Sequence, residues 1–168
     1  MPEEFFQPLS DTKTPPTYNF FNGSAWVSGA NGKTTPVISP IDQSIVGNLP
    51  VTTTAEIDEI VTKLKSAQPT WEAKPLNQRV KLMHLVADWI RHYEEYFTTL
   101  LVREIGKSVG ESKSEIVRTA ELTDYFADEV QSIHGETLSS DDFPGYDKGT
   151  TAMVERVAHG VVLCIAPF

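Results

Sequence analysis

The chain has 168 residues, of which 40% are hydrophobic and 22% are charged, and it contains 10 glycines and 11 prolines. This composition excludes collagen-like and low-complexity proteins, and it fits one globular domain with a sizeable core. The 14 basic and 23 acidic residues give a net charge of −9. Because no basic stripe is present, we expect no binding to nucleic acid, and the acidic balance argues against anionic membrane surfaces.

Cys164 is the single cysteine, so the chain can form neither an internal disulfide nor a cysteine-rich zinc site. This cysteine usage fits a reducing compartment. The acidic N-terminus lacks the pattern of a signal peptide, and the apolar runs are far shorter than the roughly 18 residues of a membrane span. We therefore expect a soluble protein of the cytoplasm.

The first third of the chain predicts a short tail followed by a small β-layer. Residues 1–17 combine four prolines with polar residues and show no periodicity, which is typical of a loosely held tail. The aromatic run 18–27 is interrupted by Asn22-Gly23, a strong signal for a β-hairpin. Two further extended pieces follow within residues 34–49. No catalytic chemistry is visible in this layer.

A first helix is predicted to begin at Thr53. Thr53 and Glu56 form the pattern of a capping box, in which each side chain accepts a hydrogen bond from the other residue's free backbone N–H. Apolar residues then recur at helical spacing. Since proline cannot donate the next helical hydrogen bond, we expect this helix to end at Pro69.

Two more amphipathic helices are predicted before residue 135. One begins near Pro75, and its apolar stripe continues at spacings of three and four to Leu101. Gly106-Lys107 marks the break after it. The next helix covers residues 112–133 and is predicted to stop before Gly135, which has the position of a C-cap glycine.

After Gly135 the apolar periodicity changes to that of β-strands. Residues 151–157 alternate between apolar and polar, as in a half-buried strand. Residues 161–165 are continuously apolar, which is typical of a strand buried on both faces in a parallel sheet. Such a strand needs parallel neighbours and covering helices, which residues 166–168 cannot supply. We therefore expect the chain to be one part of a larger protein.

Candidate reactive residues are few. The histidines show no pair with the spacing of a helical metal site beside an acid, and we interpret all of them as structural. These are His84, His92, His134 and His159. Cys164 lies within the apolar run, where burial would leave its thiol inert. Gly106-Lys107-Ser108 is similar to the end of a P-loop, but the earlier glycine and the preceding strand are missing, so we interpret it as a helix break.

Arg118 is the polar residue that most invites a functional interpretation. On a helical wheel it lies at the border of the apolar arc of the helix over 112–133. An arginine at such a border can extend into solvent or pair with Glu121 or Glu129, and the residues alone favour this interpretation. The alternative is that Arg118 faces an anionic ligand, which suits its forked guanidinium group.

Several motifs within residues 18–168 together resemble the aldehyde dehydrogenase family, and they occur in the family's order. The motifs are Asn22-Gly23, Trp26-Val27, Ser39-Pro40-Ile41-Asp42, Trp71, Arg79, Ala87-Asp88, Glu104-Ile105-Gly106-Lys107, Glu136-Thr137-Leu138 and the run from Gly160 to Phe168. The resemblance implies the N-terminal part of an α/β, Rossmann-like cofactor domain, with edge β-hairpins, three helices, a β-arm and the first parallel strand. One departure is the segment 156–160, which lacks the family's proline.

A narrower resemblance points to the non-phosphorylating glyceraldehyde-3-phosphate dehydrogenases within that family. It rests on residues 114–121 and on Asp142-Phe143-Pro144-Gly145. In that branch the arginine of the first motif contacts the substrate phosphate, which would make Arg118 a substrate-binding residue. A guanidinium group suits this role because it can pair with phosphate oxygens through two hydrogen bonds.

The resemblance implies an enzyme that oxidises an aldehyde, here glyceraldehyde 3-phosphate, to its acid with NADP or NAD. In the family a cysteine thiolate attacks the carbonyl, hydride passes to the cofactor, and a glutamate activates the hydrolytic water. These residues lie beyond Phe168 in the family, so we assign no catalytic residue here and expect the chain alone to be inactive. The first cofactor contacts would come from the backbone of Ile165, Ala166, Pro167 and Phe168.

The resemblance also divides the chain and implies its assembly. Residues 1–17 would be a flexible tail, 18–135 strands and helices of the cofactor domain, 136–160 a β-arm for oligomerisation, and 161–168 the first cofactor-binding strand. The whole enzyme would be a cytoplasmic homo-oligomer, a tetramer or dimer, acting in glycolysis. Two alternatives stay open: part of a general or semialdehyde-type aldehyde dehydrogenase, and a short, non-catalytic interaction module.

Overall fold

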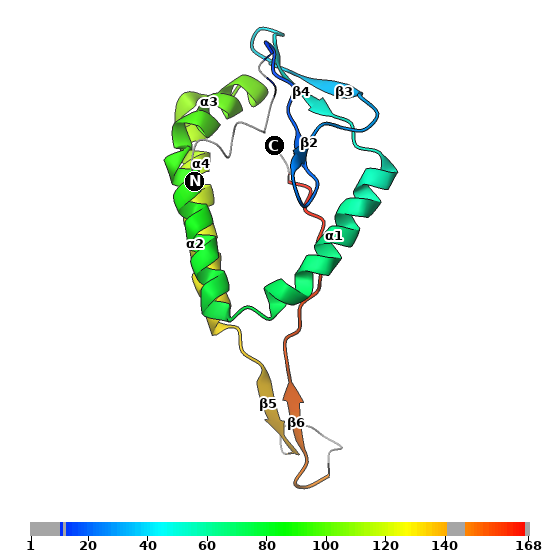
Figure 1. Ribbon diagram of the computed structural model, residues 1–168. Helices are drawn as coiled ribbons and strands as arrows, with labels where there is room; N and C mark the ends of the chain where they lie inside the picture. Colours follow the sequence, from blue (N-terminus) through cyan, green and yellow to red (C-terminus); the bar gives the residue numbers. More distant parts are fainter. Residues whose placement is uncertain (1–10, 12, 141–146, 167–168) are drawn as a thin grey trace.

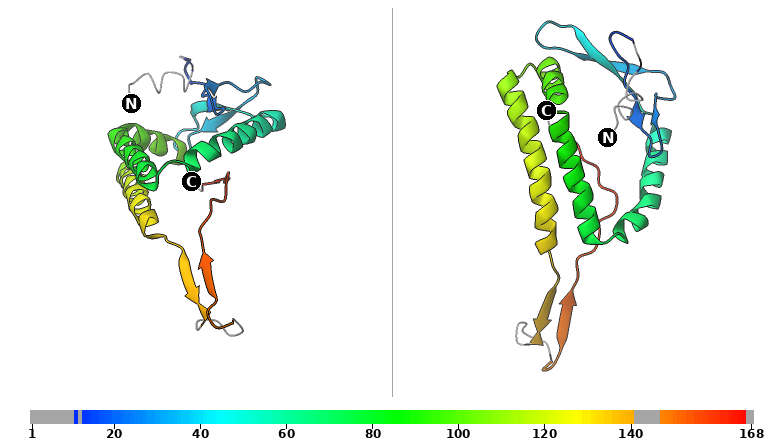
Figure 2. Two further views of the ribbon diagram at one scale, coloured as in Figure 1. Left: turned by 60° about the horizontal axis from the view of Figure 1, so that its bottom comes forward. Right: turned by 60° about the vertical axis from the view of Figure 1, so that its left-hand side comes forward.

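The structure, a computed structural model, describes residues 11, 13–140 and 147–166, and its elements form three groups (Figure 1). Small β-hairpins lie at one end, helices run along the molecule, and another hairpin extends from the opposite end. Helices α2 (Leu76–His92) and α4 (Val109–Glu129) lie side by side in every view, and α1 (Thr54–Glu72) is set apart from them (Figure 2).

The hairpin predicted around Asn22-Gly23 is confirmed. Strands β1 (Phe20–Phe21) and β2 (Trp26–Val27) pair antiparallel. The Asn22 side-chain oxygen accepts hydrogen bonds from two backbone N–H groups of the turn, both at 3.0 Å. Gly23 adopts φ 90°, a left-handed conformation that glycine reaches without steric cost.

The two extended pieces within residues 34–49 form a second antiparallel pair, of β3 (Thr34–Ile38) and β4 (Ile45–Pro50). Val46 of β4 is 1% exposed and anchors this layer. The end of the predicted tail is held to β4, because Asn48 donates its N–H to the carbonyl of Pro16 and accepts from Tyr18. The remaining part of the tail, residues 1–10 and 12, lies outside the described residues.

Helix α1 begins as predicted and ends later. The capping box is present, and Glu56 also accepts a hydrogen bond from the N–H of Ala30 at 2.7 Å, which ties the preceding loop to the helix. The predicted end at Pro69 is wrong, because α1 continues to Glu72. Proline removes one helical donor but keeps its carbonyl, and that carbonyl accepts from Ala73 N–H at 2.9 Å in the last turn.

The helix predicted from Pro75 to Leu101 is two helices, α2 and α3 (Glu94–Ile105). The chain turns at Tyr93, where ψ is 21°. The break predicted at Gly106 is confirmed: Gly106 has φ 77° and caps α3, and a Cβ there would lie 3.1 Å from Cγ of Pro40. The close approach of Pro40 and the left-handed backbone both call for glycine.

Helix α4 starts earlier and ends earlier than the predicted range 112–133. A second capping box, Ser108 with Glu111, starts it at Val109, and a short 3-10 turn, η3 (Val130–Ser132), follows Glu129. Gly135 is therefore not its C-cap. Gly135 instead allows a close backbone approach, since a Cβ there would lie 2.2 Å from the carbonyl oxygen of Val154.

The hairpin at the far end is formed by β5 (Glu136–Ser139) and β6 (Thr151–Val154), which pair antiparallel (Figure 1). It lies within the segment 136–160 predicted as a β-arm, and it extends away from the helices. The branch motif Asp142-Phe143-Pro144-Gly145 lies outside the described residues. The arm's role in subunit assembly stays a prediction.

Residues 161–166 do not form the predicted strand in this structure. Leu163 and Ile165 are 82% and 83% exposed, and Cys164, predicted to be buried, is exposed too. The physical reason is that a strand needs a neighbour for its backbone hydrogen bonds, and the described residues place none beside this segment. Its start approaches α1, where Gly160 lies against Gln68.

The helical core is built from small side chains. Helix α4 packs on both α2 and α3, and the contact with α2 is the most extensive. Ala87, Ala120 and Ala127 are almost fully buried at 0%, 0% and 5% exposure, which lets the helix backbones approach closely. Larger apolar residues of the same helices, among them Leu85 and Phe126, point outward and are more than half exposed.

Candidate functional site: a groove on helix α4

Arg118 is exposed on α4 and lines an open groove of about 700 Å³. The groove is formed by one residue before α4 and by residues of α4 as far as its second half: Lys107, Gly110, Glu111, Ser114, Glu115, Arg118, Thr119 and Leu122. Among the ion pairs of the described residues, none joins Arg118 to Glu121 or Glu129. The surface pair favoured by the sequence alone is therefore not formed, and the guanidinium group remains available to a ligand.

The other charged side chains of this groove each have a bonding partner. Lys107 forms an ion pair with Glu115. Hydrogen bonds from Ser108 lower the pKa of Glu111, so that this carboxylate stays ionised and caps α4. Within the described part of the chain, Arg118 is thus the cation of the groove that no carboxylate neutralises.

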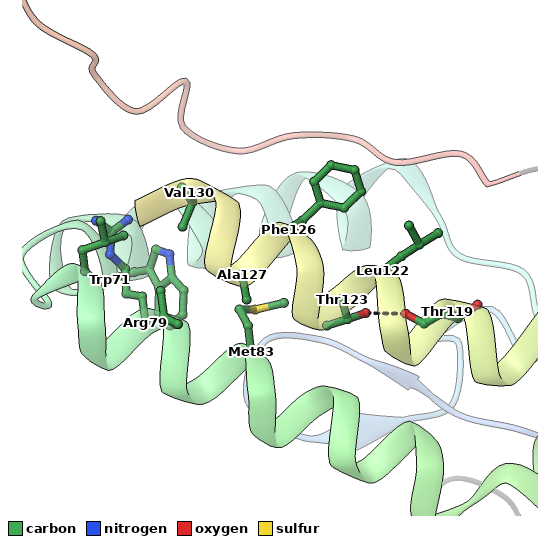
Figure 3. A pocket seen from close by; sticks show the side chains of 11 residues that line it. Trp71, Arg79, Met83, Thr119, Leu122, Thr123, Phe126, Ala127 and Val130 are labelled. Carbon is green, nitrogen blue, oxygen red and sulfur yellow. Dashed lines mark hydrogen bonds between the residues drawn. The ribbon is translucent and has the colours of Figure 1, made fainter. Parts of the chain in front are cut away.

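The groove of Arg118 adjoins an apolar groove of about 460 Å³ between α2 and α4, and Thr119 and Leu122 line both. Figure 3 shows side chains of the apolar groove on both helices, with Leu122 and Phe126 on α4 and Met83 on α2. A guanidinium group beside apolar walls can bind an anionic end of a ligand whose remaining part is uncharged. The arrangement is suited to binding such a ligand.

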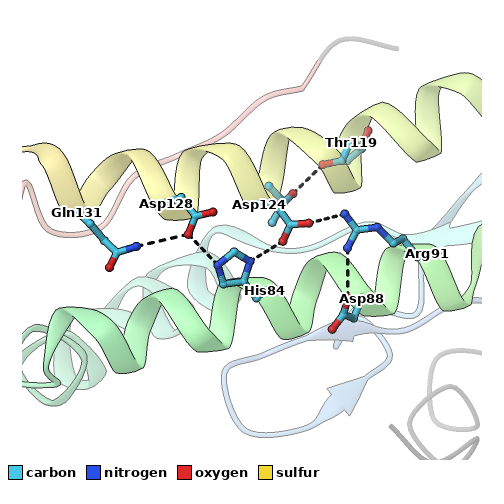
Figure 4. A network of polar contacts seen from close by, with 8 residues as sticks. His84, Asp88, Arg91, Thr119, Asp124, Asp128 and Gln131 are labelled. Carbon is cyan, nitrogen blue, oxygen red and sulfur yellow. Dashed lines mark hydrogen bonds and ion pairs between the residues drawn. The ribbon is translucent and has the colours of Figure 1, made fainter.

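His84 joins α2 to α4 within a network of charges (Figure 4). Its Nδ1 lies 2.6 Å from a carboxylate oxygen of Asp124, and its Nε2 lies 3.0 Å from one of Asp128. Arg91 pairs with the other oxygen of Asp124 and, at 3.2 Å, with Asp88. His84 therefore has a structural role, as the sequence analysis expected.

The other three histidines are exposed, and they are His92, His134 and His159. Within residues 11, 13–140 and 147–166, no group of His, Cys, Asp or Glu is arranged to hold a metal ion.

None of the described helices is both long and apolar enough to cross a membrane.

The four residues predicted to contact a cofactor are described only in part. Ile165 and Ala166 are exposed, and Pro167 and Phe168 lie outside the described residues. Neither Ile165 nor Ala166 lines the groove of Arg118, so the structure does not bring the two predicted sites together. Their roles in cofactor binding stay predictions.

Two features of the α4 region went unnoticed at the level of sequence. One is the apolar groove, which requires knowing that α2 and α4 are neighbours. The other is the His84 network, for which a signal was available: Asp124 and Asp128 are four residues apart and His84 and Arg91 are seven apart, so each pair lies on one helix face.

The comparison with protein families decides which family this is. The model of the aldehyde dehydrogenase family matches residues 26–168, nearly the whole chain. The chain belongs to the aldehyde dehydrogenase family. It is an α/β portion from the N-terminal side of that family's proteins, as its motifs predicted.

Among curated relatives, NADP-dependent glyceraldehyde-3-phosphate dehydrogenase of Triticum aestivum is 32% identical over 153 residues, covering 90% of this chain and 31% of the relative. The enzyme of that name from Streptococcus equinus is 31% identical over 150 residues. Glutarate-semialdehyde dehydrogenase of Pseudomonas putida is 27% identical over 149 residues. The chain thus spans about a third of the length of the relatives that it matches.

Solved structures agree with this assignment. The NADP-dependent glyceraldehyde-3-phosphate dehydrogenase of Bacillus halodurans, complexed with NADP, aligns with a TM-score of 0.75 at 30% identity and covers 82% of this chain and 29% of that protein. A 3,6-anhydro-L-galactose dehydrogenase aligns with a TM-score of 0.70 at 27% identity, covering 74% of this chain and 26% of that one.

Proposed function

We propose that the chain is the N-terminal portion of an NAD(P)-dependent aldehyde dehydrogenase that oxidises glyceraldehyde 3-phosphate to 3-phosphoglycerate without adding phosphate. In this reaction the aldehyde, water and NAD(P)⁺ give the acid, NAD(P)H and a proton. The chain's own contribution is to bind the substrate, and Arg118 holds the phosphate.

The observation that carries this proposal is the state of Arg118. It is exposed at a groove, its guanidinium group pairs with no carboxylate among the described residues, and it stands in the motif 114–121. A phosphate oxygen pair matches the guanidinium fork, and such a charge-assisted pair is about twice as strong as a neutral hydrogen bond. Seven curated relatives that bear the name NADP-dependent glyceraldehyde-3-phosphate dehydrogenase support the choice of substrate.

The cofactor proposed is NADP or NAD, bound in part by the backbone of residues 165–168. The carboxyl end of a strand in an open α/β sheet is where such ligands bind. Ile165 and Ala166 are exposed and lie outside any strand in this structure. Their backbone is therefore accessible to a neighbouring strand and to a ligand. When bound, the cofactor would accept the hydride. The chain alone would then be inactive, because the proposed nucleophile and base lie elsewhere in the protein.

Assembly and location follow the same proposal. The hairpin β5–β6 extends from the body and exposes Met153 to 73%, which suits an arm that a second subunit covers in a homo-oligomer, a dimer or tetramer. The proposed enzyme would act in glycolysis in the cytoplasm, and a chain with a single cysteine fits that reducing compartment.

A semialdehyde substrate is the second candidate, and the Pseudomonas putida relative favours it. A carboxylate can pair with Arg118 as a phosphate can, but it is smaller and carries less charge. The two candidates differ in which aldehyde the whole enzyme turns over.

The test is an assay of the complete protein that contains this chain, with NADP⁺ and NAD⁺ in turn. The aldehydes are glyceraldehyde 3-phosphate, glyceraldehyde and glutarate semialdehyde, each without inorganic phosphate. We expect the highest kcat/KM with glyceraldehyde 3-phosphate. A preference for glutarate semialdehyde would establish the second candidate, and no turnover of any aldehyde would favour the non-catalytic interaction module.

A further inference from the structure

The contact between α2 and α4 contains a histidine whose two ring nitrogens both face carboxylates. His84 of α2 lies between Asp124 and Asp128 of α4, at 2.6 Å and 3.0 Å. A neutral imidazole carries one proton, so it can donate to only one of these carboxylates. Both contacts are hydrogen bonds at the same time only when His84 is an imidazolium ion.

The carboxylates around the ring outnumber the cations, so the charge balance of the contact depends on the proton of His84. On α4 the ring faces Asp124 and Asp128, and Gln131 of η3 donates to Asp128 at 3.4 Å. On α2 the neighbouring cation is Arg91, which bridges Asp124 and Asp88. When His84 is protonated, two cations face three carboxylates. When His84 is neutral, Arg91 is the one cation of this network that faces the three carboxylates.

We propose that His84 is a protonation-dependent clasp, which fastens α2 to the second half of α4 as an imidazolium ion and loosens that contact when it loses its proton. The clasp bears on the apolar groove, because Asp124 and Asp128 alternate along α4 with Thr123 and Ala127, which line it. When the clasp loosens, the part of α4 that lines the apolar groove therefore moves over a larger range.

The sign of the pH effect follows from the two directions of shift. Hydrogen bonds to Asp124 and then Asp128 raise the pKa of His84. Its stabilising contribution is complete below the unfolded value of about 6.5 and is lost as pH rises through the higher folded value. Arg91 and then His84 lower the pKa of Asp124, so that contribution is lost only as pH falls into the acid range. The clasp is strongest in mildly acidic solution.

Hydrogen–deuterium exchange of the complete protein, followed by mass spectrometry at pH 5.5 and pH 8.5, tests the clasp. The exchange rates are corrected for the intrinsic pH dependence of amide exchange. Peptides from α2 and the second half of α4 are then expected to exchange about two- to fivefold faster at the higher pH. A factor of this size corresponds to the stabilisation that a partly exposed ion pair provides. In the variant His84→Gln the fast exchange is expected at both pH values.

Two further variants complete the experiment. His134→Gln removes an exposed histidine outside the helices and is expected to behave like the wild type. His84→Lys keeps a charge at both pH values and is expected to keep part of the protection at pH 8.5. The proposal is overturned if His84→Gln retains the wild-type pH dependence, or if His84→Lys loses protection as pH rises to the same extent as the wild type.

Discussion

The substitution Ser112→Ala is expected to increase the stability of the fold. This residue of α4 is completely buried, at 0% exposure, and its hydroxyl oxygen has no hydrogen-bond partner among the described residues. A buried, unsatisfied hydroxyl costs about 1–3 kcal/mol of desolvation. Alanine removes that cost and adds up to about 0.5 kcal/mol of helix propensity. The small void left by one oxygen offsets part of the gain.

The net expectation for Ser112→Ala is a stabilisation of about 1–2 kcal/mol. A domain of 150–250 residues would gain roughly 2–4 °C per kcal/mol, and a protein about three times as long as this chain gains less, so a shift of about 1–2 °C per kcal/mol is expected. Differential scanning fluorimetry of the complete protein measures this shift. Ser114→Ala is the matched control, because Ser114 is exposed on the same helix and tests helix propensity alone. A melting temperature of Ser112→Ala at or below that of Ser114→Ala would refute the reasoning.

Three further changes test the local structure. Thr53→Ala removes the capping box of α1 and should lower stability by about 0.5–2 kcal/mol in urea unfolding, whereas no loss would mean that Glu56 and Ala30 hold the helix start alone. Gly106→Ala places a Cβ at φ 77° and against Pro40, and a loss of about 1–2 kcal/mol is expected by the same measurement, with an unchanged value as the contrary result. The 168-residue chain expressed alone should associate through its exposed apolar residues 161–165, and a monodisperse monomer in size-exclusion chromatography with light scattering would contradict this.

Local signals predicted most of the elements. Asn22-Gly23 and the capping box at Thr53 act within a few residues, so the hairpin and the start of α1 could be located from the sequence. The wrong predictions came from applying a local sequence rule without the surrounding structure. Pro69 costs one hydrogen bond, yet α1 continues past it for another turn; Gly135 resembles a C-cap, yet its role is the close approach of Val154.

The site was predictable to a lesser degree. The motif around Arg118 identified the residue, but its freedom from ion pairs depends on the side chains that surround it in space. The strand predicted at 161–165 depends on neighbours that the described residues do not include. The apolar groove and the His84 network both arise from the contact of α2 with α4, two helices that are separated in sequence by α3.

The measurement that tests the central claim most directly is steady-state kinetics of Arg118→Ala in the complete protein, with glyceraldehyde 3-phosphate and with unphosphorylated glyceraldehyde. Loss of a charge-assisted pair worth about 1.5–3 kcal/mol predicts a fall of roughly 10- to 150-fold in kcat/KM for the phosphorylated aldehyde only. Arg118→Lys should recover part of it, since an ammonium group is a point charge. Arg103→Ala, at an exposed arginine of α3 outside the groove, should change neither. Equal losses for both aldehydes in Arg118→Ala would contradict the account.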